Sequence, residues 1–102
     1  MRTRQADKVT EKDIRGTIRD FLRTTGWFVV IHYQGPLSHR GFADLTAVKN
    51  GKTIYVEVKK QRGVQSEEQK QFQRDIENHG AEYILARCVE DVARLEPGAR
   101  LF

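Results

Sequence analysis

The chain has 102 residues, of which 38% are apolar and 31% charged, and its 18 basic and 14 acidic side chains give a formal charge of +4. This length allows one compact domain with a modest core and excludes a second lobe. No apolar stretch is long enough to cross a bilayer, and the N-terminus lacks the apolar run of a signal peptide, so we expect a cytoplasmic protein with no membrane partner. The basic excess mildly favours an anionic partner such as nucleic acid.

Caps and hydrophobic periodicity predict the order of the elements. Thr10, followed by acids, has the pattern of a helix start, and apolar residues then recur at helical spacing up to Gly26. The elements expected in chain order are a flexible tail over 1–9, a helix from 10 to about 25, a strand over 27–33, a loop over 34–41, a hairpin over 41–60, a loop over 61–65, a helix over 66–78, a strand over 83–87, a short helix over 90–95 and an edge strand in the tail 99–102. We therefore predict one α/β domain over 10–102, built as helix, three-strand meander, helix and strand around a central mixed sheet.

The hairpin places acidic side chains inside its strands. If Asn50-Gly51 forms a type I′ turn, the pairing register puts Asp44 directly opposite Glu57. Side chains alternate along a strand, so both acids share one face with Lys59. The opposite face is apolar and is the predicted core side, with Leu45, Ala47, Ile54, Val56 and Val58.

Two acids facing each other across a sheet destabilise it, so something must offset their repulsion. One explanation is a structural ion pair in which Lys59 neutralises one of the acids. The other is a divalent cation, because Mg²⁺ accepts one or two carboxylates together with waters and phosphate oxygens. The spacing of the residues leaves both explanations open.

The stretch GFAD, the NG turn and VEVKK resemble the PD-(D/E)xK nuclease core. More narrowly, the chain resembles the small stand-alone VRR-NUC domains of phages and bacteria, from about Thr10 to Leu95. EKDI in the opening helix, HRGFAD, IYVEVKK and SEEQ carry this resemblance, and RGxxD with SxxQ makes it more specific than D…ExK alone. Ala43 stands where the family usually has proline, which concerns the rigidity of the loop more than chemistry. The resemblance implies a restriction-endonuclease-like core.

The resemblance also implies roles for individual residues. Asp44 and Glu57 would be ligands of Mg²⁺ or Mn²⁺, together with the backbone carbonyl of Val58. Lys59 would position the attacking water and stabilise the charge that develops on the phosphate. A lysine beside two acids normally stays protonated, which favours this role over that of a general base.

Two outlying residues have a structural explanation as well as a catalytic one. The resemblance implies that Glu11 reaches the site directly or through water, and that Gln69 holds Lys59 or the attacking water. However, Glu11 also suits the first turn of a helix through the helix dipole. The spacing of Gln69 from Ser66 is that of a capping box, which accounts for the glutamine without catalysis.

Basic residues flank the motif on both sides. His39 and Arg40 precede Asp44, and Lys60 and Arg62 follow the motif lysine. We expect them to contact the DNA backbone, which would position the substrate without reading its sequence. For the first pair, a solvated loop is the alternative. The single cysteine, Cys88, cannot form an internal disulfide, and we expect it to be a small buried side chain.

The resemblance implies an Mg²⁺- or Mn²⁺-dependent DNA endonuclease with no small-molecule cofactor, in the cytoplasm of a bacterial or phage-infected cell. Stand-alone relatives are associated with homodimers that cut four-way junctions, so we expect a Holliday-junction resolvase, since paired nicks need two symmetric sites. Residues around Trp27-Phe28 or Leu101-Phe102 would supply apolar contact area. The alternatives are a flap, single-strand or restriction-type nuclease, and a non-catalytic nucleic-acid-binding module on a nuclease fold.

Overall fold

The first helix, α2 (Glu11–Thr24), begins at the cap that the sequence predicts. The structure is a computed structural model, and it describes residues 9–99. The Thr10 hydroxyl accepts a hydrogen bond from the backbone N–H of Asp13, and the Asp13 carboxylate accepts one from the backbone N–H of Thr10. This reciprocal pair fixes the start of the helix, because it satisfies two amides that the helix itself leaves unpaired.

Within residues 9–99, four strands form one sheet in which the order along the chain is also the order in space. They are β1 (Phe28–Ile31), β2 (Leu45–Lys49), β3 (Lys52–Val58) and β4 (Glu82–Ala86). The first three strands are antiparallel, whereas β4 runs parallel to β3. The parallel step requires a crossover, which α3 (Glu67–Asn78) supplies. The predicted meander, helix and strand with a mixed sheet are confirmed.

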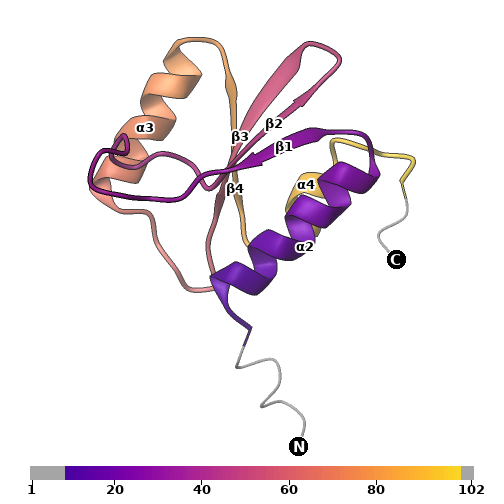
Figure 1. Ribbon diagram of the computed structural model, residues 1–102, viewed down its shortest axis with the longest axis horizontal. Helices are drawn as coiled ribbons and strands as arrows, with labels where there is room; N and C mark the ends of the chain where they lie inside the picture. The colour runs from indigo at the N-terminus through magenta and orange to yellow at the C-terminus, as the bar shows by residue number, and fades with distance from the viewer. Residues whose placement is uncertain (1–8, 100–102) are drawn as a thin grey trace, which may run out of the picture.

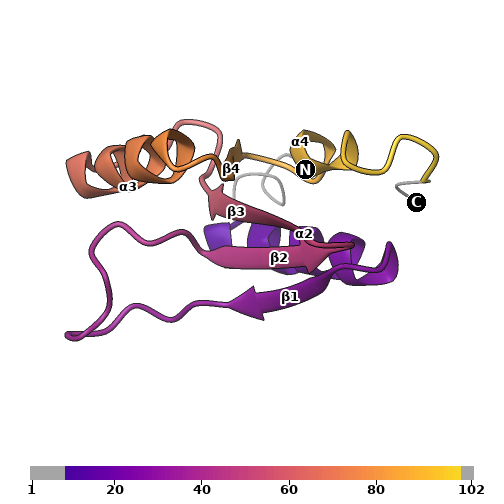
Figure 2. The same cartoon turned by 90° about the horizontal axis from the view of Figure 1, so that it is seen from above.

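Helices cover both faces of the sheet (Figures 1 and 2). α2 and the short α4 (Glu90–Ala93) lie on one face, and α3 lies on the other. The main core lies between the sheet and α2, and it contains the whole predicted apolar face of the hairpin, namely Leu45, Ala47, Ile54, Val56 and Val58. A smaller cluster under α3 is built on Ala43, Phe72 and Tyr83. The acid-bearing face is therefore the face that α3 partly covers.

The hairpin has the predicted turn and register. Asn50 and Gly51 both have positive φ, of 52° and 80°, as a type I′ turn requires. Leu45 pairs with Val56, which confirms the predicted register, but the ladder ends there. Asp44 lies just before β2, and its backbone carbonyl accepts a hydrogen bond from the amide of His32, at 2.9 Å. Asp44 thus lies just beyond the antiparallel ladder, whereas Glu57 is still paired with Leu85 of β4.

Three sequence expectations need correction. The strand predicted over 27–33 covers only Phe28–Ile31, and it starts late because the Trp27 amide donates to the Leu22 carbonyl and closes the end of α2. The prediction that Cys88 is buried is wrong: β4 ends at Ala86, and the cysteine lies exposed beyond it. The short helix ends at Ala93 rather than at 95.

Parts of two further expectations fall outside residues 9–99. The tail expected over 1–9 is described only at Val9, and the edge strand expected over 99–102 only at Ala99. Within the described range, no helix combines the length and the apolar character needed to cross a bilayer.

Candidate active site

The two acids of the motif meet at the end of β3. Glu57 belongs to the strand itself and is only 2% exposed. Asp44 reaches the same strand from the loop before β2, because its Oδ2 accepts a hydrogen bond from the backbone N–H of Val58, at 2.8 Å. That bond fixes the Asp44 carboxylate beside Glu57, so the predicted confrontation of the two acids is present although the ladder stops one residue short of it.

Glu57 is held in an environment that opposes its charge. Burial raises the pKa of Glu57 to about 8, and the charge of Asp44 and a hydrogen bond to it contribute further. As a carboxylate, Glu57 leaves Oε1 buried without a hydrogen-bond partner among the described residues. In the protonated form the group can donate to Asp44 instead. The pair therefore keeps an extra proton at neutral pH unless another positive charge is supplied.

Lys59 forms the ion pair that would give the two facing acids a purely structural explanation. Its Nζ lies 3.8 Å from Oε2 of Glu57, and both side chains are largely buried, at 14% and 3% exposure. Lys59 does lower the pKa of Glu57, but burial and Asp44 outweigh this effect. The ion pair alone therefore leaves the repulsion between the acids uncompensated.

A divalent cation fits this centre better than the ion pair alone. Among the described residues, no group donates a hydrogen bond to the buried Oε1 of Glu57, and a buried carboxylate oxygen needs such a donor or a positive charge. Within residues 9–99 no three His, Cys, Asp or Glu side chains gather into a metal-binding group. The chain thus offers two carboxylates, Asp44 and Glu57, and leaves the other positions to water and substrate oxygens. This donor set suits Mg²⁺ or Mn²⁺.

Glu11 lies at the edge of the centre rather than inside it. Its Oε2 accepts a long hydrogen bond, at 3.4 Å, from the backbone N–H of Lys60. Its negative charge also raises the pKa of Glu57. Of the two routes that the resemblance implies for Glu11, this position favours the one through water.

Gln69 takes part in the cap and in the site at the same time. Its Oε1 accepts from the backbone N–H of Ser66, at 2.8 Å, and completes the capping box of α3. Its Nε2 donates to Oε2 of Glu57, at 2.7 Å. The side chain therefore holds Glu57, whereas the resemblance implied a contact with Lys59 or with the water.

The loop before Asp44 packs against the first turn of α3. Gly41 has φ of 75°, and a Cβ at this position would collide with the backbone carbonyl of Glu68, so only glycine allows the close approach. Arg40 extends the contact with an ion pair to Glu68, at 3.6 Å. The His39 ring lies 5.6 Å from that of Phe72. His39 and Arg40 are exposed and belong to a docked loop.

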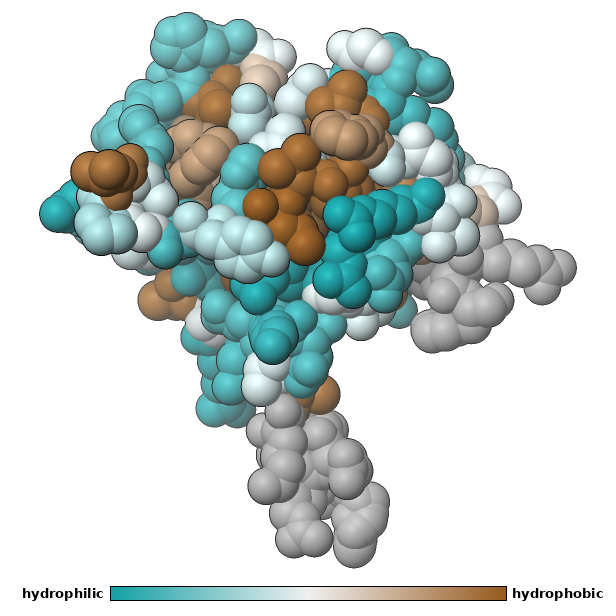
Figure 3. Space-filling view, in the orientation of Figure 1, coloured by the Kyte–Doolittle hydropathy of each residue, from teal (hydrophilic) through white to brown (hydrophobic). Residues whose placement is uncertain are grey.

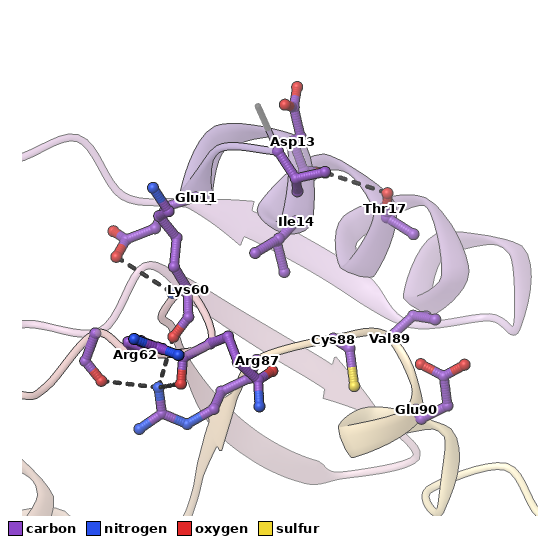
Figure 4. Close-up of a pocket in the computed structure, with 13 residues that line it drawn as sticks. Glu11, Asp13, Ile14, Thr17, Lys60, Arg62, Arg87, Cys88, Val89 and Glu90 are labelled. Carbon is purple, nitrogen blue, oxygen red and sulfur yellow. Dashed lines mark hydrogen bonds between the residues drawn. The ribbon is translucent and has the colours of Figure 1, made fainter. Parts of the chain in front are cut away.

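The segment after Lys59 is held by a residue that the sequence did not single out. Nη1 of Arg87 donates to the carbonyls of Lys60, Gln61 and Gly63, at 2.6, 3.1 and 2.7 Å. Figure 4 shows this guanidinium reaching into the loop beside Glu11. The loop and α2 border a pocket, and the exposed Lys60 and Arg62 are among the residues that line it.

Arg15 is the second residue that sequence reasoning missed. It follows Glu11 by one helical turn, and its Nη1 lies 3.8 Å from Oδ1 of Asp44. The spacing was a usable signal, because residues four apart share one face of a helix. The contacts of Arg87 had no such signal, since the carbonyls that it binds lie more than twenty residues away in the sequence.

Comparison with known proteins gives a match among solved structures. No protein-family model matches this sequence, and no curated protein matches it. A solved structure described as "VRR_NUC domain" is similar in fold, with a TM-score of 0.72 over 88% of this chain and 97% of the other, at 18% sequence identity. This similarity confirms the expected α/β fold class, with a four-strand mixed sheet and flanking helices. The fold of this chain is that of a VRR-NUC domain.

Proposed function

We propose that the protein is a divalent-metal-dependent endonuclease that hydrolyses phosphodiester bonds in DNA. The observation that carries this proposal is the buried Glu57 beside Asp44. The pKa of Glu57 is raised to about 8. A fold of the VRR-NUC type supports the choice of a nuclease, because acids at this position suit phosphodiester chemistry. A divalent cation held by the two acids would acidify a water molecule and neutralise charge on a phosphate oxygen.

The chain's own residues have distinct parts in this reaction. Asp44 and Glu57, with the Val58 carbonyl, would hold the cation, and the backbone bond to Asp44 fixes one of these ligands before binding. Gln69 fixes the other ligand through its bond to Glu57. Such preorganisation lowers the cost of assembling the site.

Lys59 supplies a positive charge that is already oriented. Its side chain is only 14% exposed and its Nζ lies 3.8 Å from Glu57. In its protonated form it donates to the scissile phosphate or to the attacking water, and it stabilises negative charge that develops in the transition state. Glu11 acts at the edge of the centre through water.

Exposed cations on both sides of the centre would hold the DNA backbone. His39 and Arg40 lie on the docked loop before Asp44, and Lys60 and Arg62 lie on the loop after Lys59. Contacts of this kind position a nucleic acid by its phosphates and weaken as salt increases. They would act on DNA in the cytoplasm of a bacterial or phage-infected cell.

A homodimer acting on a four-way junction is the form of this function that we propose. β1 is an edge strand, and its side away from α2 presents Phe28 and Val30, which are 69% and 39% exposed. Figure 3 shows apolar side chains gathered over this part of the molecule. An apolar edge of this kind is typical of an interaction surface. A two-fold pair through β1 would supply the two sites that paired nicks require.

Cleavage of defined DNA substrates tests the proposal. Purified protein is incubated with a four-way junction, a flap and a plain duplex, in Mg²⁺, in Mn²⁺ and in EDTA. We expect cutting of the junction that EDTA abolishes and that Asp44→Asn, Glu57→Gln and Lys59→Ala each lose. Lys59→Ala should still bind Mn²⁺, because it keeps both carboxylates. Binding of the junction without cutting in either metal would instead indicate a non-catalytic module.

Sedimentation velocity tests the dimer separately. The wild type should sediment as a dimer at micromolar concentration, and Phe28→Glu should sediment as a monomer because it places a charge in an apolar contact. A monomeric wild type would exclude the dimer and with it symmetric junction resolution, but would leave the nicking of flaps or single strands open.

A further inference from the structure

Each acid of the centre has its own basic partner in the structure. Lys59 lies 3.8 Å from Glu57, and Arg15 of α2 lies at the same distance from Asp44. The two cations differ in exposure. Lys59 is 14% exposed, whereas Arg15 is 28% exposed and pairs with an Asp44 side chain that is 22% exposed. Arg15 is therefore the more accessible of the two cations to an incoming substrate.

Asp44 is divided between two partners. Its Oδ2 accepts the backbone hydrogen bond of Val58, at 2.8 Å, and its Oδ1 faces Arg15. Oδ1 is thus the oxygen that the backbone leaves for a cation. A cation at that oxygen and the Arg15 guanidinium carry like charge, so binding of one weakens the hold of the other.

We propose that Arg15 binds a phosphate of the substrate beside the acid pair, after a cation has replaced it at Asp44. This inference rests on the proposed nuclease function. A guanidinium stays charged at any working pH, and its planar fork matches two phosphate oxygens. The contact with Asp44 is too long for a tight hydrogen bond, and the side chain is part-exposed, so the guanidinium can turn toward a phosphodiester.

Arg15 would then be a catalytic residue by contact with the reacting group. Arg15 lies on the same face of α2 as Glu11, one turn further along, so a guanidinium donor and a carboxylate acceptor lie close together beside the acid pair. If Arg15 only neutralised Asp44, its replacement would have a different effect. The substitution would then change folding stability and metal affinity but leave the DNA cleavage rate at saturating metal unaltered.

Metal affinity measured without DNA provides the first test. Calorimetric titration with Mn²⁺ is carried out on the wild type, Arg15→Gln, Arg15→Lys and Arg19→Gln. Arg19 is the matched control, because it lies one turn further along α2 and pairs with its neighbour Asp20. We expect Arg15→Gln to bind Mn²⁺ at least about fivefold more tightly, because this is the effect of two unit charges about 4 Å apart in bulk water and Mn²⁺ carries two charges. Arg19→Gln should match the wild type. Equal affinities in Arg15→Gln and the wild type would overturn the competition at Asp44.

Cleavage at saturating Mn²⁺ provides the second test. We expect Arg15→Gln to cut at least about tenfold more slowly in spite of its tighter metal binding, as loss of a charge-assisted phosphate contact predicts. Arg15→Lys should be intermediate because it keeps the charge without the fork. A rate for Arg15→Gln within twofold of the wild type would overturn the phosphate role. Circular dichroism establishes that each variant is folded, and Arg15→Lys serves if the glutamine variant is not.

A third measurement separates this inference from the proposed function. If the wild type cuts none of the substrates, the proposed function fails, and the inference is judged by duplex binding in Mn²⁺ alone. Arg15→Gln should then bind duplex at least about threefold more weakly than Arg19→Gln, because only Arg15 would contact a phosphate next to the acids. Equal binding by the two variants would overturn the inference.

Discussion

Replacing Glu57 with glutamine changes one property of the protein that can be measured without any substrate. The amide matches the shape of the protonated acid and keeps an acceptor for the hydrogen bond from Gln69. It cannot ionise. Glu57→Gln therefore removes the cost of charging a buried group while leaving the packing of the site nearly unchanged.

The magnitude follows from the two pKa values. The pKa of Glu57 rises from an ordinary 4.5 to about 8 in the folded protein. Between these values the unfolded chain has lost a proton that the folded protein keeps, so the free energy of unfolding falls as the pH rises through the window. Above about pH 8 both states are ionised and the fall ends. At 1.36 kcal/mol per unit of pKa, the full loss is on the order of 5 kcal/mol.

Urea denaturation in EDTA at several pH values measures this loss. The wild type should become less stable from pH 5 to pH 8.5, and Glu57→Gln should lose much less over the same range. At pH 8, Mn²⁺ should restore much of the lost stability to the wild type and little to the variant. Glu67→Gln, which alters an acid that is 84% exposed, is the control and should follow the wild type. Parallel curves for the wild type and Glu57→Gln would refute the reasoning.

Three further predictions concern the supports of the site. Gly41→Ala should lower the free energy of unfolding by several kcal/mol in urea denaturation and weaken Mn²⁺ binding, because the added methyl collides with the first turn of α3. The control Gly51→Ala also has positive φ but lies in open space, so it should lose only about 1 kcal/mol. Equal losses in the two variants would contradict this prediction. Ser66→Ala and Gln69→Ala should each lose about 1 kcal/mol through the cap. Only Gln69→Ala should also weaken Mn²⁺ binding in calorimetry. If Ser66→Ala weakened Mn²⁺ binding equally, Gln69 would act through the helix cap alone. Arg87→Met should speed hydrogen exchange in the loop after the motif lysine and slow cleavage, and unchanged exchange would show that the three carbonyl contacts do not hold that loop.

Local rules made the hairpin and the helix starts predictable. Positive φ at Asn50-Gly51 leaves few turn types, so the register of the strands and the two faces of the hairpin followed directly. The caps at Thr10 and Ser66 depend on residues only three positions away and were equally readable. The confrontation of the two acids required no more than this register.

The remaining features of the site depend on long-range packing and could not be predicted from the sequence. The burial of Glu57 depends on how α3 lies over the sheet, and strand pattern alone does not specify that placement. The second partner of Gln69 and the three carbonyls bound by Arg87 become visible only when distant segments are placed in space. Cys88 was misjudged because the strand ended one residue earlier than its apolar pattern suggested.

One amide group, that of Gln69, joins the winding of α3 to the anchoring of Glu57. If α3 has not yet packed against the sheet, or has been cleaved by a protease, the Glu57 carboxylate therefore loses the hydrogen bond that orients it. On the proposed function, newly synthesised or partly degraded copies would cleave DNA poorly, and DNA in the cell would be exposed only to fully folded enzyme.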